Sequence, residues 1–223
     1  MLNEDKRPRI AVIDYGAGNL RSVARALEAS GGAAIVTELA HEIEVADAVV
    51  LPGVGAAGSA MRGLAERDVV GPIRQVVASG RPFLGVCLGL QVIMSSSDEN
   101  GGVECLGIVP GRVRQLPADQ KIPHIGWNQV RQPTPHRIFD GIPDRSNFYF
   151  VHSYAVVPDD PKVVIGVTDY GGDFVSAIAL NNVVATQFHP EKSAALGLRV
   201  YRNFVNWARE HSAALAGTIR ERA

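Results

Sequence analysis

Cys87 stands in a sequence pattern that is typical of nucleophilic catalysis. It lies at the centre of Gly85-Val86-Cys87-Leu88-Gly89, between an apolar run and a helical pattern. Glycines two residues before and two residues after a nucleophile are typical of a nucleophile elbow, a sharp turn between a strand and a helix. Backbone N–H groups at the start of that helix favour the thiolate. The pattern predicts a cysteine nucleophile, and its alternative is a small buried cysteine at a tight turn.

A candidate general base and its carboxylate partner lie in Gln187-Phe188-His189-Pro190-Glu191. Residues two apart in an extended segment point to the same side, and Pro190 keeps His189 out of the helical region. Glu191 can then accept one imidazole N–H and hold the ring, while the other ring nitrogen exchanges a proton with the Cys87 sulfur. None of the other five histidines combines these features. We therefore expect a Cys87–His189–Glu191 triad.

Two glycine-rich turns are further candidates for function. In Leu51-Pro52-Gly53-Val54-Gly55 the glycines permit exposed N–H groups, and an N–H of Val54 or Gly55 together with that of Leu88 predicts an oxyanion hole. The alternative for this segment is a plain turn. Gly16-Ala17-Gly18 suggests a dinucleotide-binding turn, but Arg21 occupies the place of the third glycine, so this hypothesis is much weaker.

The first half of the sequence alternates short apolar runs with helical patterns. We expect strands at 9–14, 33–37, 48–51 and 82–86, and helices at 19–30, 59–66, 68–79 and 88–94. This alternation is typical of a doubly wound parallel sheet. Because the carboxyl ends of such strands meet at one crevice, we expect Cys87 and His189 to lie together although they are far apart in the sequence.

From about Gly107 the pattern changes to strands separated by Pro, Gly and Asn. Hairpin strands are expected at 111–116, 126–131, 148–157, 163–168, 174–180 and 183–188, and a helix at 194–211. With no repeat and no linker, the prediction is one domain over residues 1–223, with flexible ends at about 1–8 and 212–223.

Composition excludes several classes of protein. Of the 223 residues, 46% are hydrophobic and 20% charged, which is typical of a globular protein. The formal net charge of -1 leaves no basic excess, so we expect no nucleic-acid partner. The sequence has no run of 18 apolar residues and no signal-like start, so we expect no membrane association and a cytoplasmic location. Two cysteines exclude a disulfide framework and a structural zinc site, and we expect no metal and no cofactor.

Taken in order, Pro52-Gly53-Val54-Gly55, Gly85-Val86-Cys87-Leu88-Gly89 and His189-Pro190-Glu191 resemble the class I, or triad, glutamine amidotransferases over nearly the whole chain. Further segments are similar to the glutaminase subunits of imidazole glycerol phosphate synthase, and these are residues 14–20, 121–128, 148–154 and 191–193. The resemblance implies an α/β, flavodoxin-like three-layer fold whose mostly parallel central sheet has additional antiparallel strands in the second half.

The resemblance also implies an activity and roles for further residues. Glutamine would be hydrolysed to glutamate, and the ammonia would be passed within a heterodimer to a cyclase subunit of histidine biosynthesis. The positions that bind glutamine in the family correspond to Gly53, Gln91, Glu99, His152, Ser153 and Tyr154. The positions that face the cyclase or its ammonia passage correspond to Asn19, Trp127, Tyr149 and Lys192.

Two alternatives of different kinds remain at this point. The chain could be the amidotransferase subunit of another pathway, such as anthranilate or pyridoxal phosphate synthesis, but segments 121–128 and 148–154 argue against it. It could also be a non-catalytic regulatory binding module on the same fold. The presence of Cys87, His189 and Glu191 together argues against that second alternative.

Overall fold

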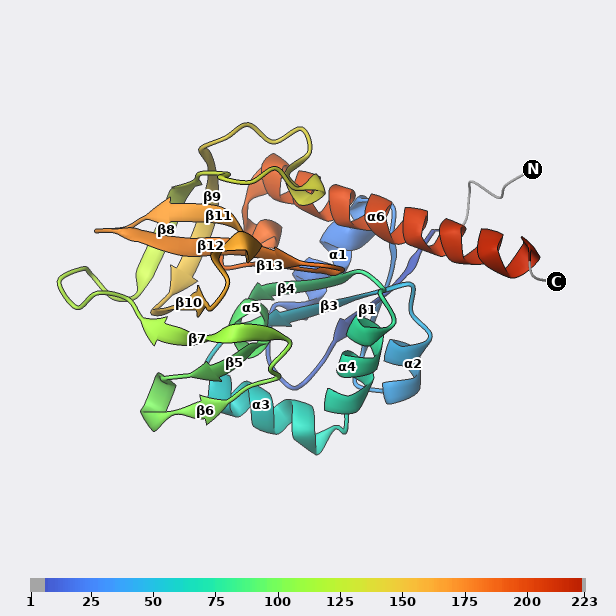
Figure 1. Cartoon of the computed structure of the whole chain (residues 1–223), viewed down its shortest axis with the longest axis horizontal. Helices are drawn as coiled ribbons and strands as arrows, with labels where there is room; N and C mark the ends of the chain where they lie inside the picture. Colours follow the sequence, from blue (N-terminus) through green and yellow to red (C-terminus); the bar gives the residue numbers. More distant parts are fainter. Residues whose placement is uncertain (1–6, 222–223) are drawn as a thin grey trace.

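The structure, a computed structural model, describes residues 7–221 and consists of a large mixed sheet with helices on both faces (Figure 1). Eleven strands form this sheet in the order β2-β1-β3-β4-β13-β12-β10-β7-β5-β6, with β11 paired to β12. Strands β8 and β9 pair only with each other and form a second, small sheet. Of the flexible ends expected at about 1–8 and 212–223, residues 1–6 and 222–223 lie outside the described residues.

The first part of the chain supplies the parallel half of the sheet and the helices that flank it. Its strands are β1 (Arg9–Ile13), β2 (Ala33–Thr37), β3 (Ala48–Gly53), β4 (Phe83–Cys87) and β5 (Met94–Ser97). Its helices are α1 (Leu20–Ala29), α2 (Ala40–Glu44), α3 (Ala57–Glu66), α4 (Val70–Ala78) and α5 (Leu88–Val92), followed by the short 3-10 helix η1 (Glu99–Gly101).

The second part supplies most of the antiparallel strands and the long last helix. Its strands are β6 (Val103–Glu104), β7 (Val109–Gln115), β8 (His124–Val130), β9 (Ser146–His152), β10 (Tyr154–Pro158), β11 (Val164–Asp169), β12 (Asp173–Leu180) and β13 (Val183–Thr186). Its helical segments are η2 (Arg137–Phe139), η3 (Pro161–Val163), η4 (Pro190–Lys192) and α6 (Ala194–Glu221).

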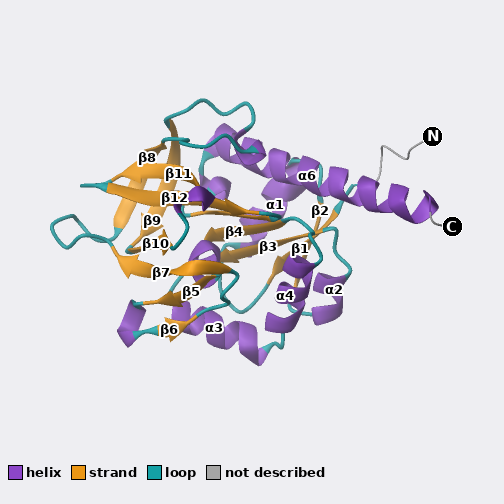
Figure 2. Ribbon diagram, in the orientation of Figure 1, coloured by secondary structure: helices purple, strands orange, loops and turns teal. Residues whose placement is uncertain are grey.

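Alternation along the parallel strands builds two cores, one on each face of the sheet. Ile10 and Val12 of β1 face the core under α1 and α6, whereas Ala11 and Ile13 face the core under α2, α3, α4 and α5. Figure 2 shows α6 and α1 on one side of the strands and α2, α3 and α4 on the other. The parallel order β2-β1-β3-β4-β13 confirms the predicted three-layer α/β fold.

Two expected elements differ most from the structure. The single strand predicted at 148–157 is wrong, because the chain changes sheets at Ser153: β9 pairs with β8, whereas β10 pairs with β7 and β12. The helix predicted at 194–211 continues to Glu221. Residues 213–217, Ala-Ala-Leu-Ala-Gly, contain good helix formers and no proline, so nothing in the local sequence ends the helix at His211.

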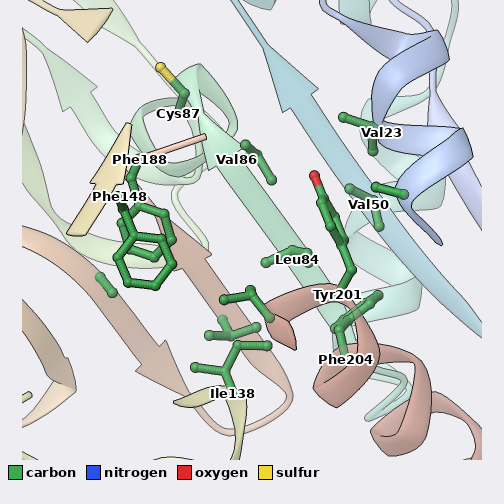
Figure 3. Close-up of a cluster of buried hydrophobic side chains, with 14 of the residues drawn as sticks. Val23, Val50, Leu84, Val86, Cys87, Ile138, Phe148, Phe188, Tyr201 and Phe204 are labelled. Atoms are coloured by element: carbon green, nitrogen blue, oxygen red, sulfur yellow. The ribbon is translucent and has the colours of Figure 1, made fainter. Parts of the chain in front are cut away.

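An aromatic cluster joins the second sheet to the last helix beneath the end of β4 (Figure 3). Phe148 of β9 stacks on Phe188 with 4.2 Å between ring centroids, and Tyr201 and Phe204 of α6 lie in the same buried cluster. This packing fixes β9 and the segment after β13 close to Cys87. Within residues 7–221, no helix combines the length and the apolar character needed to cross a bilayer.

Candidate active site

Cys87 occupies a strained turn between β4 and α5. Its backbone has φ 54° and ψ −103°, a conformation that costs a non-glycine residue about 1–3 kcal/mol and that clusters at functional sites. The flanking glycines are required by close contacts. A Cβ at Gly89 would overlap the carbonyl oxygen of Leu51, and a Cβ at Gly85 would lie 3.0 Å from the Gly89 backbone. The turn thus has the backbone geometry of a nucleophile elbow.

His189 and Glu191 form a buried ion pair next to Cys87. Nδ1 of His189 lies 2.8 Å from Oε1 of Glu191, and each side chain is only 2% exposed. Burial by itself lowers the pKa of His189, but interactions with Cys87 and Glu191 outweigh it and raise the pKa to about 9. At neutral pH the imidazole is therefore protonated and donates to the carboxylate.

The second carboxylate oxygen of Glu191 faces a tyrosine. The Tyr201 hydroxyl lies 3.5 Å from Oε2, a long hydrogen bond. Complete burial, followed by the nearby Glu191 charge, raises the pKa of Tyr201 well above its usual value, so the hydroxyl stays neutral and can only support the carboxylate as a donor.

Strand β9 fixes the backbone of His189. The His189 N–H donates to the Tyr149 carbonyl at 2.9 Å. The buried Ser193 hydroxyl donates to the His189 carbonyl at 2.6 Å and accepts from the Tyr149 N–H at 3.0 Å. These three hydrogen bonds hold the imidazole at a fixed position relative to the small sheet.

The imidazole and the thiol are neighbours without a regular hydrogen bond between them. Nε2 of His189 is buried and has no hydrogen-bond partner among the described residues, although the charge of Cys87 acts on the ring. Sγ of Cys87 lies 3.9 Å from the Val151 carbonyl oxygen and 3.6 Å from Nε2 of Gln187. Catalytic hydrogen bonds are often long in a ligand-free site and shorten in the substrate complex.

A cavity of about 400 Å³ opens beside Cys87. Its volume is within the range of about 300–1,000 Å³ that is typical of small-molecule sites. It is lined by Val54, Gly55, Cys87, Leu88, Gln91, Glu99, Pro123, Val151, His152, Ser153, Tyr154 and Lys192. Gly53, one of the positions expected to bind glutamine, does not line this cavity. It is buried at the end of β3 and packs against Tyr15, so closely that a Cβ at this position would overlap the Tyr15 hydroxyl.

Polar groups on the cavity wall are held in place by backbone atoms. Oε2 of Glu99 accepts a 2.7 Å hydrogen bond from the N–H of Ala57, the first residue of α3. Nε2 of Gln91 donates to the Tyr154 carbonyl at 3.0 Å. Nδ1 of His152 lies 2.8 Å from the same carbonyl, and burial lowers the pKa of His152 to about 4, so its ring is neutral.

Three of the four residues expected at a partner interface lie together. Trp127 of β8 is 55% exposed and contacts the Tyr149 ring edge-on, with centroids 6.2 Å apart. Nζ of Lys192 lies 5.7 Å from the centre of that Tyr149 ring. Asn19 lies directly before α1, and no hydrogen bond or ring contact among the described residues joins it to the other three.

Four residues contact the catalytic candidates but were not among the predicted site residues, and these are Gln187, Val151, Ser193 and Tyr201. For Gln187 a signal was present, because residues 187, 189 and 191 are spaced by two and an extended segment places such residues on one side. Val151 acts through its main-chain carbonyl, and Tyr201 lies on the apolar face of the following helix α6, where the pattern indicates a core residue, so no local pattern marks either one.

Comparison with known proteins gives consistent matches over most of the chain. Residues 11–207 match the family described as glutamine amidotransferase class-I. The imidazole glycerol phosphate synthase subunit HisH of Moorella thermoacetica is 51% identical over 195 residues, which cover 87% of this chain and 93% of that protein. HisH of Aquifex aeolicus is 52% identical over 197 residues, covering 88% and 95%.

Solved structures with much lower identity share the fold. PurLQS from Thermotoga maritima matches with a TM-score of 0.73 at 18% identity, over 91% of this chain and 99% of that one. The glutaminase domain of Trypanosoma brucei CTPS matches with a TM-score of 0.66 at 20% identity, over 91% and 94%. On the family match and the identity to HisH proteins, this chain belongs to the class I glutamine amidotransferases and, within them, to the family of HisH subunits of imidazole glycerol phosphate synthase.

Proposed function

We propose that this chain hydrolyses L-glutamine with Cys87, His189 and Glu191 and delivers the ammonia to the cyclase subunit of imidazole glycerol phosphate synthase, the heterodimer of histidine biosynthesis. The observation that carries the proposal is the meeting of a strained, cavity-facing cysteine with a buried imidazolium–carboxylate pair. The free thiols of Cys87 and Cys105 suit a reducing compartment, so we place the activity in the cytoplasm. The proposed chemistry uses only side chains and backbone groups of the protein, and we expect no cofactor.

The first chemical step is attack on the side-chain amide of glutamine. The Cys87 thiolate adds to the amide carbon, and the carbonyl oxygen becomes an oxyanion. Backbone N–H groups of Val54 or Gly55 and of Leu88, which line the same cavity, would stabilise this charge. Glu99, Gln91 and the segment 152–154 surround the remaining volume of the cavity, where the α-amino and α-carboxyl groups of glutamine would bind.

His189 supplies the proton that lets ammonia leave. Because its pKa is raised to about 9, the imidazole carries a proton at neutral pH and can donate it from Nε2, while Glu191 holds Nδ1. Collapse of the tetrahedral intermediate breaks the carbon–nitrogen bond and leaves a thioester on Cys87. Neutral His189 then accepts a proton from water, and the water hydrolyses the thioester to glutamate.

The ammonia requires a protected route to its acceptor, because ammonia released into neutral water becomes protonated and loses its nucleophilicity. Lys192 lines the cavity and also contacts Tyr149, which lies beside the exposed Trp127. Exposed tryptophan and tyrosine side chains are typical of the centres of protein interfaces. We therefore place the cyclase, a (β/α)8 protein, against this cluster, with Asn19 as a further contact.

The test compares glutamate and imidazole glycerol phosphate production by the chain, the cyclase and their mixture. The mixture should form the product from either glutamine or an ammonium salt. Cys87→Ala should abolish the glutamine-dependent reaction and leave the ammonium-dependent reaction intact, because only the ammonia source is lost. A Cys87→Ala variant that still hydrolyses glutamine, or a chain that assembles with another synthase and not with the cyclase, would contradict the proposal.

A further inference from the structure

Gln187 is a fully buried polar residue at the junction between β13 and η4. It is 0% exposed, and its backbone N–H donates to the Ser176 carbonyl at 2.8 Å, which fixes it to β12. A glutamine amide costs free energy when it leaves water, whereas an apolar side chain of similar volume would pack there without that cost. Packing alone therefore does not explain why a glutamine occupies this buried position.

The side chain of Gln187 bridges the nucleophile and a residue of the cavity wall. Its Nε2 lies 3.6 Å from Sγ of Cys87. Its Oε1 accepts a 3.2 Å hydrogen bond from Nε2 of Gln91, which also donates to the Tyr154 carbonyl at 3.0 Å. The Gln187 amide is thus a side-chain donor to the sulfur, in addition to the His189 imidazole, whose interaction with Cys87 helps to raise the pKa of His189.

The network fixes which end of the Gln187 amide faces the sulfur. The Tyr154 carbonyl can only accept a hydrogen bond, so the Gln91 atom beside it must be the NH₂ group. That NH₂ group also faces Gln187, and therefore the Gln187 atom opposite it must be the carbonyl oxygen. The remaining NH₂ group of Gln187 then points at Cys87. Because the Tyr154 carbonyl sets the orientation of the Gln91 amide, and Gln91 in turn sets that of Gln187, Gln187 must act as a hydrogen-bond donor to Cys87.

The two hydrogen-bond neighbours of the sulfur act in opposite ways. The Val151 carbonyl, 3.9 Å away, can accept a hydrogen bond from the thiol and offers nothing to a thiolate. The Gln187 N–H donates to the sulfur, and such a bond is stronger when the acceptor is charged. The amide therefore favours the thiolate form of Cys87 and restrains the position of its sulfur.

We propose that Gln187 is a positioning residue for the glutaminase reaction, in which its side-chain amide, oriented by Gln91, holds the Cys87 sulfur as a thiolate in the place from which it attacks glutamine. This inference deepens the proposed function and rests on Cys87 being the nucleophile. Gln187 does not line the cavity, so it acts through Cys87 and makes no contact with bound glutamine.

The experiment uses the full chain in complex with the cyclase and compares Gln187→Met with Gln187→Glu. Met keeps the approximate volume and removes the donor. Glu keeps an acceptor for Gln91 but replaces the donor with a carboxylate. Thr186→Val is the matched control, because Thr186, the last residue of β13 and the neighbour of Gln187, is equally buried and its hydroxyl donates to the Phe188 carbonyl at 3.1 Å without reaching Cys87.

For Gln187→Met we expect kcat to fall by about 10- to 100-fold with KM changed by less than about threefold, because a lost hydrogen bond to a charged group acts on the nucleophile and not on glutamine binding. Gln187→Glu should lower kcat further than Gln187→Met, because its carboxylate places a second negative charge beside the Cys87 thiolate. Thr186→Val should stay within about threefold of the unchanged chain in kcat. All proteins are compared at equal folded fraction, measured by thermal unfolding.

A second measurement follows alkylation of Cys87 by iodoacetamide against pH and needs no glutamine. The titratable groups that face Cys87 or the cavity beside it are His189 with Glu191 behind it, Tyr15, His152, Glu99, Tyr154 and Lys192. These groups are unchanged in the variants. The midpoint of the alkylation profile should move to higher pH in Gln187→Met, further in Gln187→Glu, and stay in place in Thr186→Val.

The two measurements separate the possible failures. If the unchanged chain does not hydrolyse glutamine, the proposed function is wrong, and the alkylation profile still decides whether Gln187 acts on Cys87. An alkylation midpoint and a kcat that are the same in Gln187→Met and Thr186→Val would overturn the positioning role and leave Gln187 as a packing residue.

Discussion

Replacing Glu191 by Gln tests the electrostatic reasoning about the triad most directly. Glutamine keeps the shape and an acceptor for His189 Nδ1 but removes the charge. An imidazolium and a carboxylate whose charges are about 4 Å apart attract by about 4 kcal/mol at an effective dielectric constant near 20. Because about 1.4 kcal/mol is a factor of ten in rate, we expect kcat to fall by about 100- to 1,000-fold.

The pH dependence of the same variant gives an independent readout. His189 must be protonated to release ammonia, and this form is lost as pH rises through its pKa of about 9. The Glu191 charge is one of the interactions that raise this pKa, so its removal lowers the pKa. The alkaline limb of kcat/KM, measured as glutamate formation between about pH 6 and 10, should therefore move to lower pH in Glu191→Gln.

Tyr201→Phe provides the control on the same carboxylate. It removes the 3.5 Å contact to Oε2 and leaves the charge and the 2.8 Å bond to His189 in place, so kcat should fall by no more than about threefold. If Glu191→Gln loses less than about tenfold, or if its alkaline limb stays where it is in the unchanged chain, the charge of Glu191 does not control His189 and the reasoning is refuted.

Three further predictions concern neighbouring residues. Burial raises the pKa of Cys105 to about 11, so this thiol is not reactive at neutral pH, and Cys105→Ala should leave glutaminase activity within about twofold; a large loss would exclude Cys87 as the sole nucleophile. Glu99→Gln should raise KM for glutamine by about tenfold with little change in kcat, and a change in kcat alone would contradict a role in binding. Gly89→Ala, whose Cβ overlaps the Leu51 carbonyl, should lower Tm by about 5–10 °C, whereas Gly71→Ala, in open space on α4, should not lower it.

The parallel half of the fold could be predicted from the sequence because its signals are local. The buried strands β3 and β4 are short apolar runs that end at Gly53 and at the helix start after Cys87, and the order of runs and helices leaves few topologies. The strand predicted at 33–37 matches β2 at both ends. The elbow could also be predicted, since its two glycines are required by contacts within a few residues of the turn and with the adjacent β3.

The antiparallel half was harder because its pairing is not local. The segment from Phe148 to Val157 is apolar apart from His152 and Ser153, and these two polar residues do not by themselves indicate that the chain changes sheets at Ser153; the change depends on which strands are available on either side. The last strand and the last helix were predicted with the correct type of secondary structure. The predicted end of the helix at His211 was wrong, because the sequence after His211 still favours a helix and α6 continues to Glu221. Local pattern predicts the element, and tertiary pairing decides its extent.

Strands β8 and β9, the small separate sheet, place different constraints on the sequence changes that each can accept. On β9, the main-chain carbonyls of Tyr149 and Val151 contact His189 and Cys87, so a substitution that shifts this backbone would displace the catalytic groups. On β8, Ile125 and Trp127 are 60% and 55% exposed and their backbones pair only with β9. A change of partner surface should therefore be accepted more readily on β8 than any change that moves the β9 backbone away from the catalytic groups.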